Sequence, residues 1–148
     1  MNHAMTRRVL VFSVMAALCA ALSGCSSSSP SKGEDVGSLQ ITDKVAGAGA
    51  DAINGRLVTV HYTGWLYSST AADHHGSQFD SSRGAIPYTF VLGSGTVIRG
   101  WDLGVLGMKA GGQRTLTIPS SLGYGPPGYS NIPGGSALVF DIELLEIR

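Results

Sequence analysis

Alternating apolar and polar positions along the chain predict a series of β-strands. Between residues 57 and 63, the side chains of Val58, Val60 and Tyr62 fall on one face and polar side chains fall on the other. This two-residue period is typical of a strand with one buried face. The same alternation recurs in three later segments, at residues 88–92, 116–118 and 138–144.

One segment between these strands has a helical period instead. Ile98, Trp101, Val105 and Met108 are separated by three, four and three residues, which places them on one stripe of a helix. Glycines within this segment cost about 1 kcal/mol each relative to alanine, so tertiary packing must stabilise the helix. The economical architecture is an α+β fold in which a short helix lies against one curved antiparallel sheet, with Trp101 facing the concave side.

The N-terminal residues have the layout of an export signal. Two arginines precede an apolar run over residues 9–22, which falls short of the roughly 20 residues needed to span a bilayer. The run ends in the sequence LSGC, whose cysteine is Cys25, and this sequence resembles the lipobox of bacterial lipoproteins. The resemblance implies that Cys25 is lipidated and becomes the first residue of the mature chain. The alternative is an ordinary secretory signal.

Composition divides the chain into three parts. We expect a signal peptide at residues 1–24, a flexible Ser-rich tether at residues 25–36 and one folded domain at residues 37–148. A serine-rich segment buries too little apolar surface to order itself, whereas 43% hydrophobic residues in a chain of 148 suffice for one core. The formal net charge is zero and no basic run follows the first ten residues, which argues against nucleic acid as a partner.

Six short motifs occur in the order and approximate spacing of the FKBP-type peptidyl-prolyl cis-trans isomerases. They are VHYTG at 60–64, FDSSR at 79–83, VIRGWD at 97–102, GQR at 112–114, YG at 124–125 and LVFDIELL at 138–145. Each motif alone is modest, but six in register rarely occur by chance. The chain therefore resembles this family over nearly all of residues 39–148.

The resemblance implies a strongly twisted antiparallel sheet wrapped around one short α-helix, with a hydrophobic pocket between them that accepts a prolyl ring. Carried over by motif, Trp101 corresponds to the pocket floor. Tyr88 stands where the family usually has phenylalanine. In a later loop, Ile132 matches a pocket-rim position and Tyr129 stands about where a histidine is common. The implied pocket walls are Tyr62, Phe79, Val97, Ile98, Tyr124 and Phe140.

The reaction of this family needs little from the protein beyond a shaped cavity. Rotation about a peptide bond faces a barrier of about 18–20 kcal/mol, and X–Pro bonds interconvert in tens to hundreds of seconds. No bond breaks, so no nucleophile, metal ion or cofactor is expected. A twisted amide is less polar than a planar one, and a dry apolar cavity favours it. The resemblance implies that the Ile98 N–H and the Tyr124 hydroxyl hold the flanking carbonyl groups, while Asp80 lies at the pocket edge beside a tyrosine such as Tyr62.

Each of these residues also has a structural reading. Aromatic side chains on sheet faces, such as Tyr62 and Phe140, are by default core residues, and Trp101 could simply fill the core. Asp80 precedes two serines, and its carboxylate could cap backbone N–H groups in a turn. The functional reading rests on the occurrence of all of them together.

The segment between Gly64 and Phe79 is longer than the tight hairpin that the family commonly has there. It includes Asp73, His74 and His75. Adjacent histidines in a polar loop are more often solvated than bound to a metal ion, so no metal site is expected. We expect the additional residues to extend a loop beside the pocket.

Together these features predict a lipid-anchored, extracytoplasmic prolyl isomerase of the cell envelope that assists the folding of exported proteins. The expected partners are proline-containing peptides, exported client proteins, macrolides of the FK506 type and, through the anchor, a membrane. We expect a monomer. Two other functions remain open: a module that binds proline-containing segments or a protein partner with little catalysis, and a purely structural envelope lipoprotein.

Overall fold

The computed structural model describes residues 32–148 of the chain. The expected signal peptide, Cys25 and most of the expected tether therefore lie outside the described residues. Within residues 32–148, no helix has the length and apolar character needed to cross a membrane.

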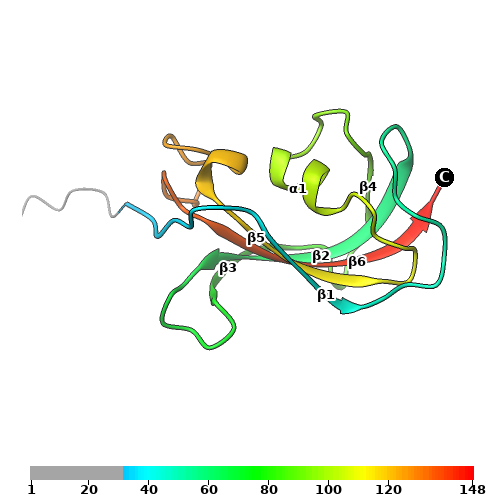
Figure 1. The fold of residues 1–148 in the computed structure, drawn as a ribbon. Helices are drawn as coiled ribbons and strands as arrows, with labels where there is room; N and C mark the ends of the chain where they lie inside the picture. The colour runs from blue at the N-terminus through cyan, green and yellow to red at the C-terminus, as the bar shows by residue number, and fades with distance from the viewer. Residues whose placement is uncertain (1–31) are drawn as a thin grey trace, which may run out of the picture.

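The described residues form one antiparallel sheet with a single short α-helix against it (Figure 1). The strand order is β1-β5-β6-β2-β3, and β4 pairs with the part of β2 that β3 leaves open. This arrangement confirms the predicted fold class. The strands are β1 (Gln40–Val45), β2 (Leu57–Tyr67), β3 (His75–Ser81), β4 (Tyr88–Val91), β5 (Gln113–Ile118) and β6 (Leu138–Ile147), and the helices are α1 (Arg99–Gly104) and a 3-10 helix, η1 (Ser120–Leu122).

Strand β2 organises the sheet because it pairs with three other strands. On one side it pairs along its length with β6. On the other side, residues 57–60 pair with β4 and residues 63–67 pair with β3, so Tyr62 lies between the two partners. The alternation predicted for β2 is confirmed, since Val58 and Val60 are fully buried.

Helix α1 lies against the concave face of the sheet, and two glycines let it approach β5 closely (Figure 1). A Cβ atom on Gly104 would stand 2.5 Å from Leu116 Cδ1, and one on Gly100 would collide with Ile118. Glycine has a low helix propensity, but a larger residue at either position would push the helix away from the sheet. The helix ends at Gly104, so it is shorter than the predicted stripe of apolar positions, which extends to Met108.

The segment between β2 and β3 differs from the loop expected there. Strand β2 continues to Tyr67, which pairs with His75 at the start of β3. Only residues 68–74 therefore form the connection. Two stacked pairs stiffen this hairpin: Trp65 on His75, with ring centroids 4.0 Å apart, and Tyr67 on His74 at 4.9 Å. The hairpin tip and α1 lie on opposite sides of the sheet in Figure 1. No residue of this connection lines the cavity described in the next subsection.

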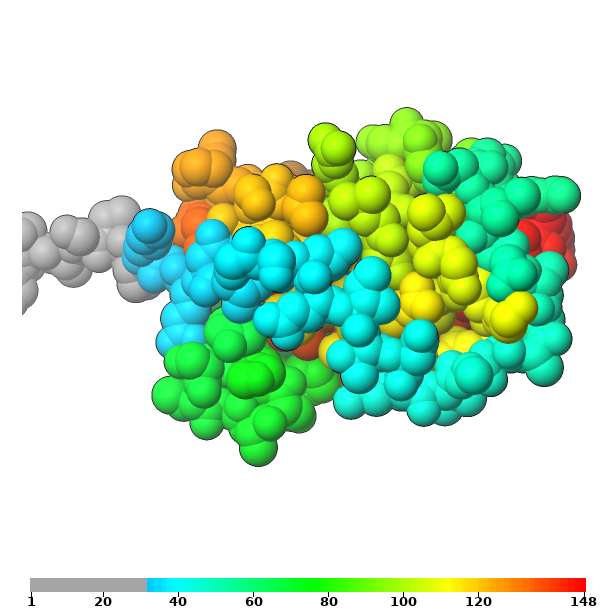
Figure 2. Space-filling view, in the orientation of Figure 1, coloured from blue at the N-terminus to red at the C-terminus, as the bar shows by residue number. Residues whose placement is uncertain are grey.

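The C-terminal end of the expected tether is folded onto the domain. Glu34 accepts hydrogen bonds from Ser69 in the hairpin, and Asp35 accepts hydrogen bonds from Ser120 at the start of η1. Figure 2 shows this blue segment packed between the green hairpin and the orange loop that follows η1. Serine-rich composition predicts poor burial, but it says nothing of such carboxylate contacts with distant loops.

Candidate active site

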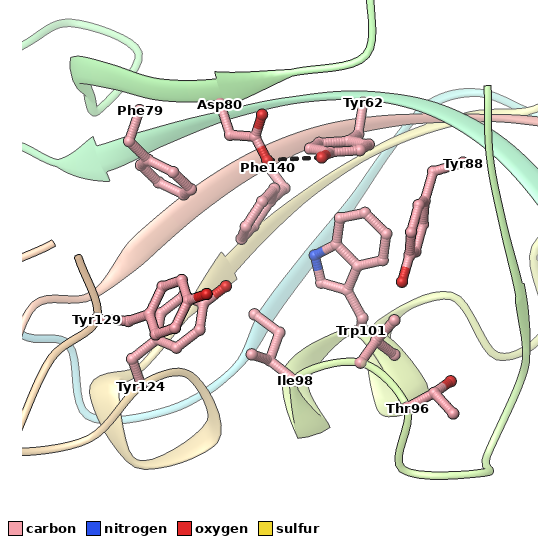
Figure 3. Close-up of a pocket in the computed structure, with 11 residues that line it drawn as sticks. Tyr62, Phe79, Asp80, Tyr88, Thr96, Ile98, Trp101, Tyr124, Tyr129 and Phe140 are labelled. Carbon is pink, nitrogen blue, oxygen red and sulfur yellow. Dashed lines mark hydrogen bonds between the residues drawn. The ribbon is translucent and has the colours of Figure 1, made fainter. Parts of the chain in front are cut away.

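A concave cavity of about 470 Å³ opens between α1 and the sheet (Figure 3). Its walls come from β2, β3, β4 and β6, from the segment leading into α1, and from the loop after η1. Strands supply four of the aromatic rings, and the helix and the loop supply the other three. The lining residues are Tyr62, Phe79, Asp80, Tyr88, Thr96, Val97, Ile98, Trp101, Tyr124, Tyr129 and Phe140.

The cavity brings together nine of the ten pocket residues predicted from the sequence. The exception is Ile132, which is only 6% exposed and belongs to the hydrophobic core. Tyr129, which the sequence placed about where the family has a histidine, also lines the cavity. Thr96 also lines it and was not predicted; it directly precedes a recognised motif, but nothing in its residue type marks it.

Trp101 forms the floor of the cavity and is 4% exposed. Its ring meets Tyr62 edge-on, with centroids 5.0 Å apart, and meets Phe140 edge-on at 5.2 Å. Edge-to-face contacts of this kind favour aromatic pairs beyond their buried area. The buried indole N–H has no hydrogen-bond partner within residues 32–148, and Figure 3 places it on the side facing Phe140 and Ile98. The floor is therefore apolar apart from one unused donor.

Asp80 joins the edge of the cavity to its floor through Tyr62. The Tyr62 hydroxyl donates a hydrogen bond of 2.6 Å to Asp80 Oδ2, while Oδ1 accepts the Ser81 N–H at 2.8 Å. Both readings of Asp80 therefore hold, since one oxygen caps the backbone and the other faces the pocket. Burial, and then the bond to Asp80, raise the pKa of Tyr62 well above its usual value of 10. The hydroxyl consequently stays protonated at neutral pH.

Gly64 allows two aromatic walls to meet. A Cβ atom at this position would stand 2.7 Å from Phe140 Cε1 and 2.8 Å from Phe79 Cζ. Without it, the rings of Phe79 and Phe140 lie edge-to-face with centroids 5.5 Å apart. The glycine of the VHYTG motif is thus required by the shape of the pocket.

The segment before α1 presents a backbone donor at the cavity. Ile98 precedes the first residue of the helix, and its N–H meets no acceptor within residues 32–148. The Asp102 carboxylate holds the preceding loop by accepting the N–H groups of Gly93 at 2.8 Å and Gly95 at 3.1 Å. Both glycines have positive φ, a conformation that suits glycine. Asp102 belongs to α1, so the helix itself holds the loop that precedes it.

Two stacked tyrosines form the wall opposite Asp80. The rings of Tyr124 and Tyr129 are nearly parallel, with centroids 5.1 Å apart, and Figure 3 shows both hydroxyl groups directed toward the cavity. Burial raises the pKa of Tyr124 above its usual value. Of the four tyrosines in the lining, only Tyr62 donates a side-chain hydrogen bond to a group within residues 32–148.

The backbone explains why Tyr129 lines the cavity and Ile132 does not. The two residues pair across a tight turn, with Tyr129 N–H to Ile132 O at 3.1 Å and Ile132 N–H to Tyr129 O at 2.8 Å. Within the turn, Ser130 has a φ of 51°. Ile132 is buried and anchors the turn, whereas Tyr129 is 64% exposed and reaches the cavity mouth.

The described residues contain no cluster of three or more His, Cys, Asp and Glu side chains that could hold a metal ion. What the cavity offers is an aromatic floor and walls, one oriented carboxylate and unengaged N–H and O–H donors. Such a site can bind and orient an apolar ring flanked by carbonyl groups.

Comparison with known proteins agrees with this geometry. The sequence profile described as FKBP-type peptidyl-prolyl cis-trans isomerase matches residues 49–145. The FK506-binding protein of Neisseria meningitidis serogroup A is 48% identical over 114 residues, which are 76% of this chain and 98% of that protein. FK506-binding protein 4 of Emericella nidulans is 46% identical over 115 residues, which are 78% of this chain but only 22% of that longer protein.

Solved structures show the same fold. The crystal structure of AtFKBP13 has a TM-score of 0.63 and 40% sequence identity, covering 74% of this chain and 93% of that one. The crystal structure of FkpA from Escherichia coli has a TM-score of 0.63 and 39% identity, covering 74% of this chain and 48% of that one. Both matches support the sheet-and-helix architecture described above.

Proposed function

The chain belongs to the FKBP-type peptidyl-prolyl cis-trans isomerase family, and we propose that it catalyses cis–trans isomerisation of X–Pro bonds in exported client proteins. The observation that carries this proposal is the cavity floored by Trp101, with the Tyr62–Asp80 hydrogen bond at its edge. A prolyl ring is compact and apolar, so it suits a cavity walled by aromatic side chains.

Catalysis in this proposal is preferential binding of the twisted amide. Resonance holds the planar peptide bond behind a barrier of about 18–20 kcal/mol. Twisting removes the resonance and makes the amide less polar, so surroundings such as Trp101 and Phe140 disfavour it less than the planar form. Substrate and product contain the same bonds, and no covalent intermediate is needed.

In this proposal, two donors hold the peptide on either side of the rotating bond. The Ile98 N–H and the Tyr124 hydroxyl have no partner within residues 32–148. Carbonyl groups of a bound peptide can accept these hydrogen bonds and keep the chain bent while one amide rotates. The Tyr124 hydroxyl is protonated at neutral pH, and burial raises its pKa further above the usual value, so it remains a donor.

Asp80 has an electrostatic role in the same scheme. The planar amide carries more negative charge on its oxygen than the twisted amide does. A carboxylate held near that oxygen therefore destabilises the planar form more, which lowers the barrier. The bonds from Tyr62 and Ser81 fix the carboxylate in place, so little reorganisation is needed during rotation.

A protease-coupled assay on a short Leu-Pro peptide tests this function. We expect the protein to accelerate isomerisation and a macrolide of the FK506 type to inhibit it, because relatives of the chain are named FK506-binding proteins. Acceleration that the macrolide does not inhibit would argue against catalysis in this pocket. Absence of acceleration would argue against an enzyme.

We also propose that the protein is a lipoprotein held at a membrane outside the cytoplasm. The support is the apolar run at residues 9–22 and the LSGC sequence ending at Cys25. Two or three acyl chains would give stable attachment, at about 0.8 kcal/mol per buried methylene. Cys25→Ser should abolish incorporation of labelled fatty acid and leave an unprocessed precursor. If the variant still partitions into detergent with unchanged mobility, the anchor is not at Cys25.

A further inference from the structure

Asp35 lies outside residues 49–145, which match the family, and within the segment that composition predicted as a tether. Both oxygens of its carboxylate nevertheless accept hydrogen bonds from one buried residue of the domain. Oδ1 accepts the Ser120 N–H at 2.7 Å, and Oδ2 accepts the Ser120 hydroxyl at 2.6 Å. Ser120 is 8% exposed and begins η1. A carboxylate that accepts two bonds at this position caps the start of that helix.

The contact continues from Ser120 to the pocket. The Ser120 carbonyl oxygen accepts the N–H of Gly123 at 3.0 Å and the N–H of Gly125 at 2.9 Å. These two residues flank Tyr124, whose hydroxyl faces the cavity. Asp35 is therefore joined by two successive hydrogen-bonded steps to the backbone on both sides of Tyr124.

The neighbours of Asp35 hold the other end of the same loop. The Glu34 carbonyl oxygen accepts the Ala137 N–H at 2.7 Å, and the Gly33 N–H donates to the Gly134 carbonyl at 3.3 Å. Residues 33–35 thus contact both the beginning and the end of the loop that carries Tyr124 and Tyr129. In Figure 2 the blue segment packs against this orange loop. A loop fixed at both ends has less freedom to move its side chains out of the cavity.

We propose that Asp35 is a positioning residue for the isomerase site: it acts through Ser120 to hold the Tyr124 hydroxyl at the mouth of the pocket. This inference rests on the proposed function. It adds to the site a residue that lies before the domain matched by the family.

The ionisation of Asp35 agrees with this role. Burial by itself would raise the pKa of Asp35, but the hydrogen bonds from Ser120 and Val36 outweigh it, and the pKa falls below its usual value. The carboxylate therefore remains charged, and a charged acceptor, at neutral pH.

Glu34 provides a matched control. Its carboxylate also binds one serine through both N–H and hydroxyl, at 2.7 Å and 3.2 Å, but that serine is Ser69 of the β2–β3 hairpin. No residue of the hairpin connection at 68–74 lines the cavity. Glu34→Ala therefore removes an equal charge from the same segment without touching the route to Tyr124.

The test is a double-mutant cycle in the full chain. Asp35→Ala should lower kcat/KM for a Leu-Pro peptide about three- to tenfold, the range expected for loss of a positioned hydrogen bond. Asp35→Asn, which keeps one acceptor, should recover part of this loss, and Glu34→Ala should leave kcat/KM unchanged. In a Tyr124→Phe background, Asp35→Ala should have little further effect, because the hydroxyl that it positions is already gone.

The cycle distinguishes positioning from stability. If Asp35→Ala lowers kcat/KM equally in both backgrounds, or no more than Glu34→Ala does, Asp35 is not a positioning residue. Circular dichroism and thermal unfolding of each variant show whether it is folded at the assay temperature. If the wild type does not accelerate isomerisation, the proposed function fails, and the same cycle is run on the Kd of an FK506-type macrolide. Non-additivity there would still support the role of Asp35, and additivity would overturn it.

Discussion

The Tyr62 hydroxyl donates a hydrogen bond of 2.6 Å to the Asp80 carboxylate, which ties the rim of the pocket to the ring that packs against Trp101. The carboxylate has a second bond to the Ser81 N–H, so its position is fixed by two donors. A charge held in this way can act on a bound amide without first reorganising.

Asp80→Val should therefore impair catalysis more than it impairs folding. We expect kcat/KM for a Leu-Pro peptide to fall about ten- to a hundredfold, as is usual when a hydrogen-bonded charge is removed from a site. The control is Asp51→Val, which removes a surface ion pair with Lys109; neither residue lines the cavity. Equal losses in the two variants, measured in the same assay, would contradict a role for Asp80.

The pH dependence of the reaction should be flat around neutrality. Burial raises the pKa of both Tyr62 and Tyr124, so the folded protein favours their protonated forms. The contribution of these two hydroxyls to folding stability is complete below the usual tyrosine pKa of 10 and is lost as the pH rises through their raised pKa values. We expect kcat/KM to stay constant from about pH 6 to pH 9. A bell-shaped profile within that range would instead indicate general acid–base catalysis.

Gly64→Ala tests whether the shape of the aromatic wall matters. The new methyl group would press on Phe79 and Phe140, so one or both rings must move. We expect a loss of about 1–3 kcal/mol in the free energy of unfolding, with weaker macrolide binding measured by calorimetry. Gly37→Ala is the matched control, since a Cβ there meets no atom within 4 Å. Full binding by a folded Gly64→Ala protein would show that this wall tolerates displacement.

The strands that were predicted from the sequence are those with one buried face. Strand β6 is the clearest example, because Leu138, Phe140, Ile142 and Leu144 are all buried. Strand β1 gave no such signal, since every one of its residues is exposed and it pairs only with β5 at the edge of the sheet. An edge strand held mainly by backbone hydrogen bonds leaves little trace in a hydrophobic pattern.

The pocket was predicted best where its residues belong to recognisable motifs on regular elements. Tyr62 and Phe140 lie on strands, whose alternation fixes the face that each side chain occupies. Tyr129 and Ile132 lie in an irregular loop, where one turn decides which of them points outward. Hydrophobic periodicity in the sequence does not indicate which of the two residues points outward.

The role inferred for Asp35 could not have been read from its surroundings in the sequence. Its partner, Ser120, lies 85 residues further along the chain. The neighbouring serines and glycine predict a flexible segment, and local composition carries no information on a contact at that separation. Only the folded structure brings the two residues together.

Exchange spectroscopy by NMR on a Leu-Pro peptide tests the central claim most directly, because one experiment reports both binding and isomerisation. Uncatalysed exchange takes tens to hundreds of seconds. With the protein at a small fraction of the peptide concentration, we predict exchange between cis and trans resonances within about a second, suppressed by an FK506-type macrolide. If the peptide resonances shift on binding while the exchange rate stays at its value in buffer, the pocket is a binding module and the enzymatic account is wrong.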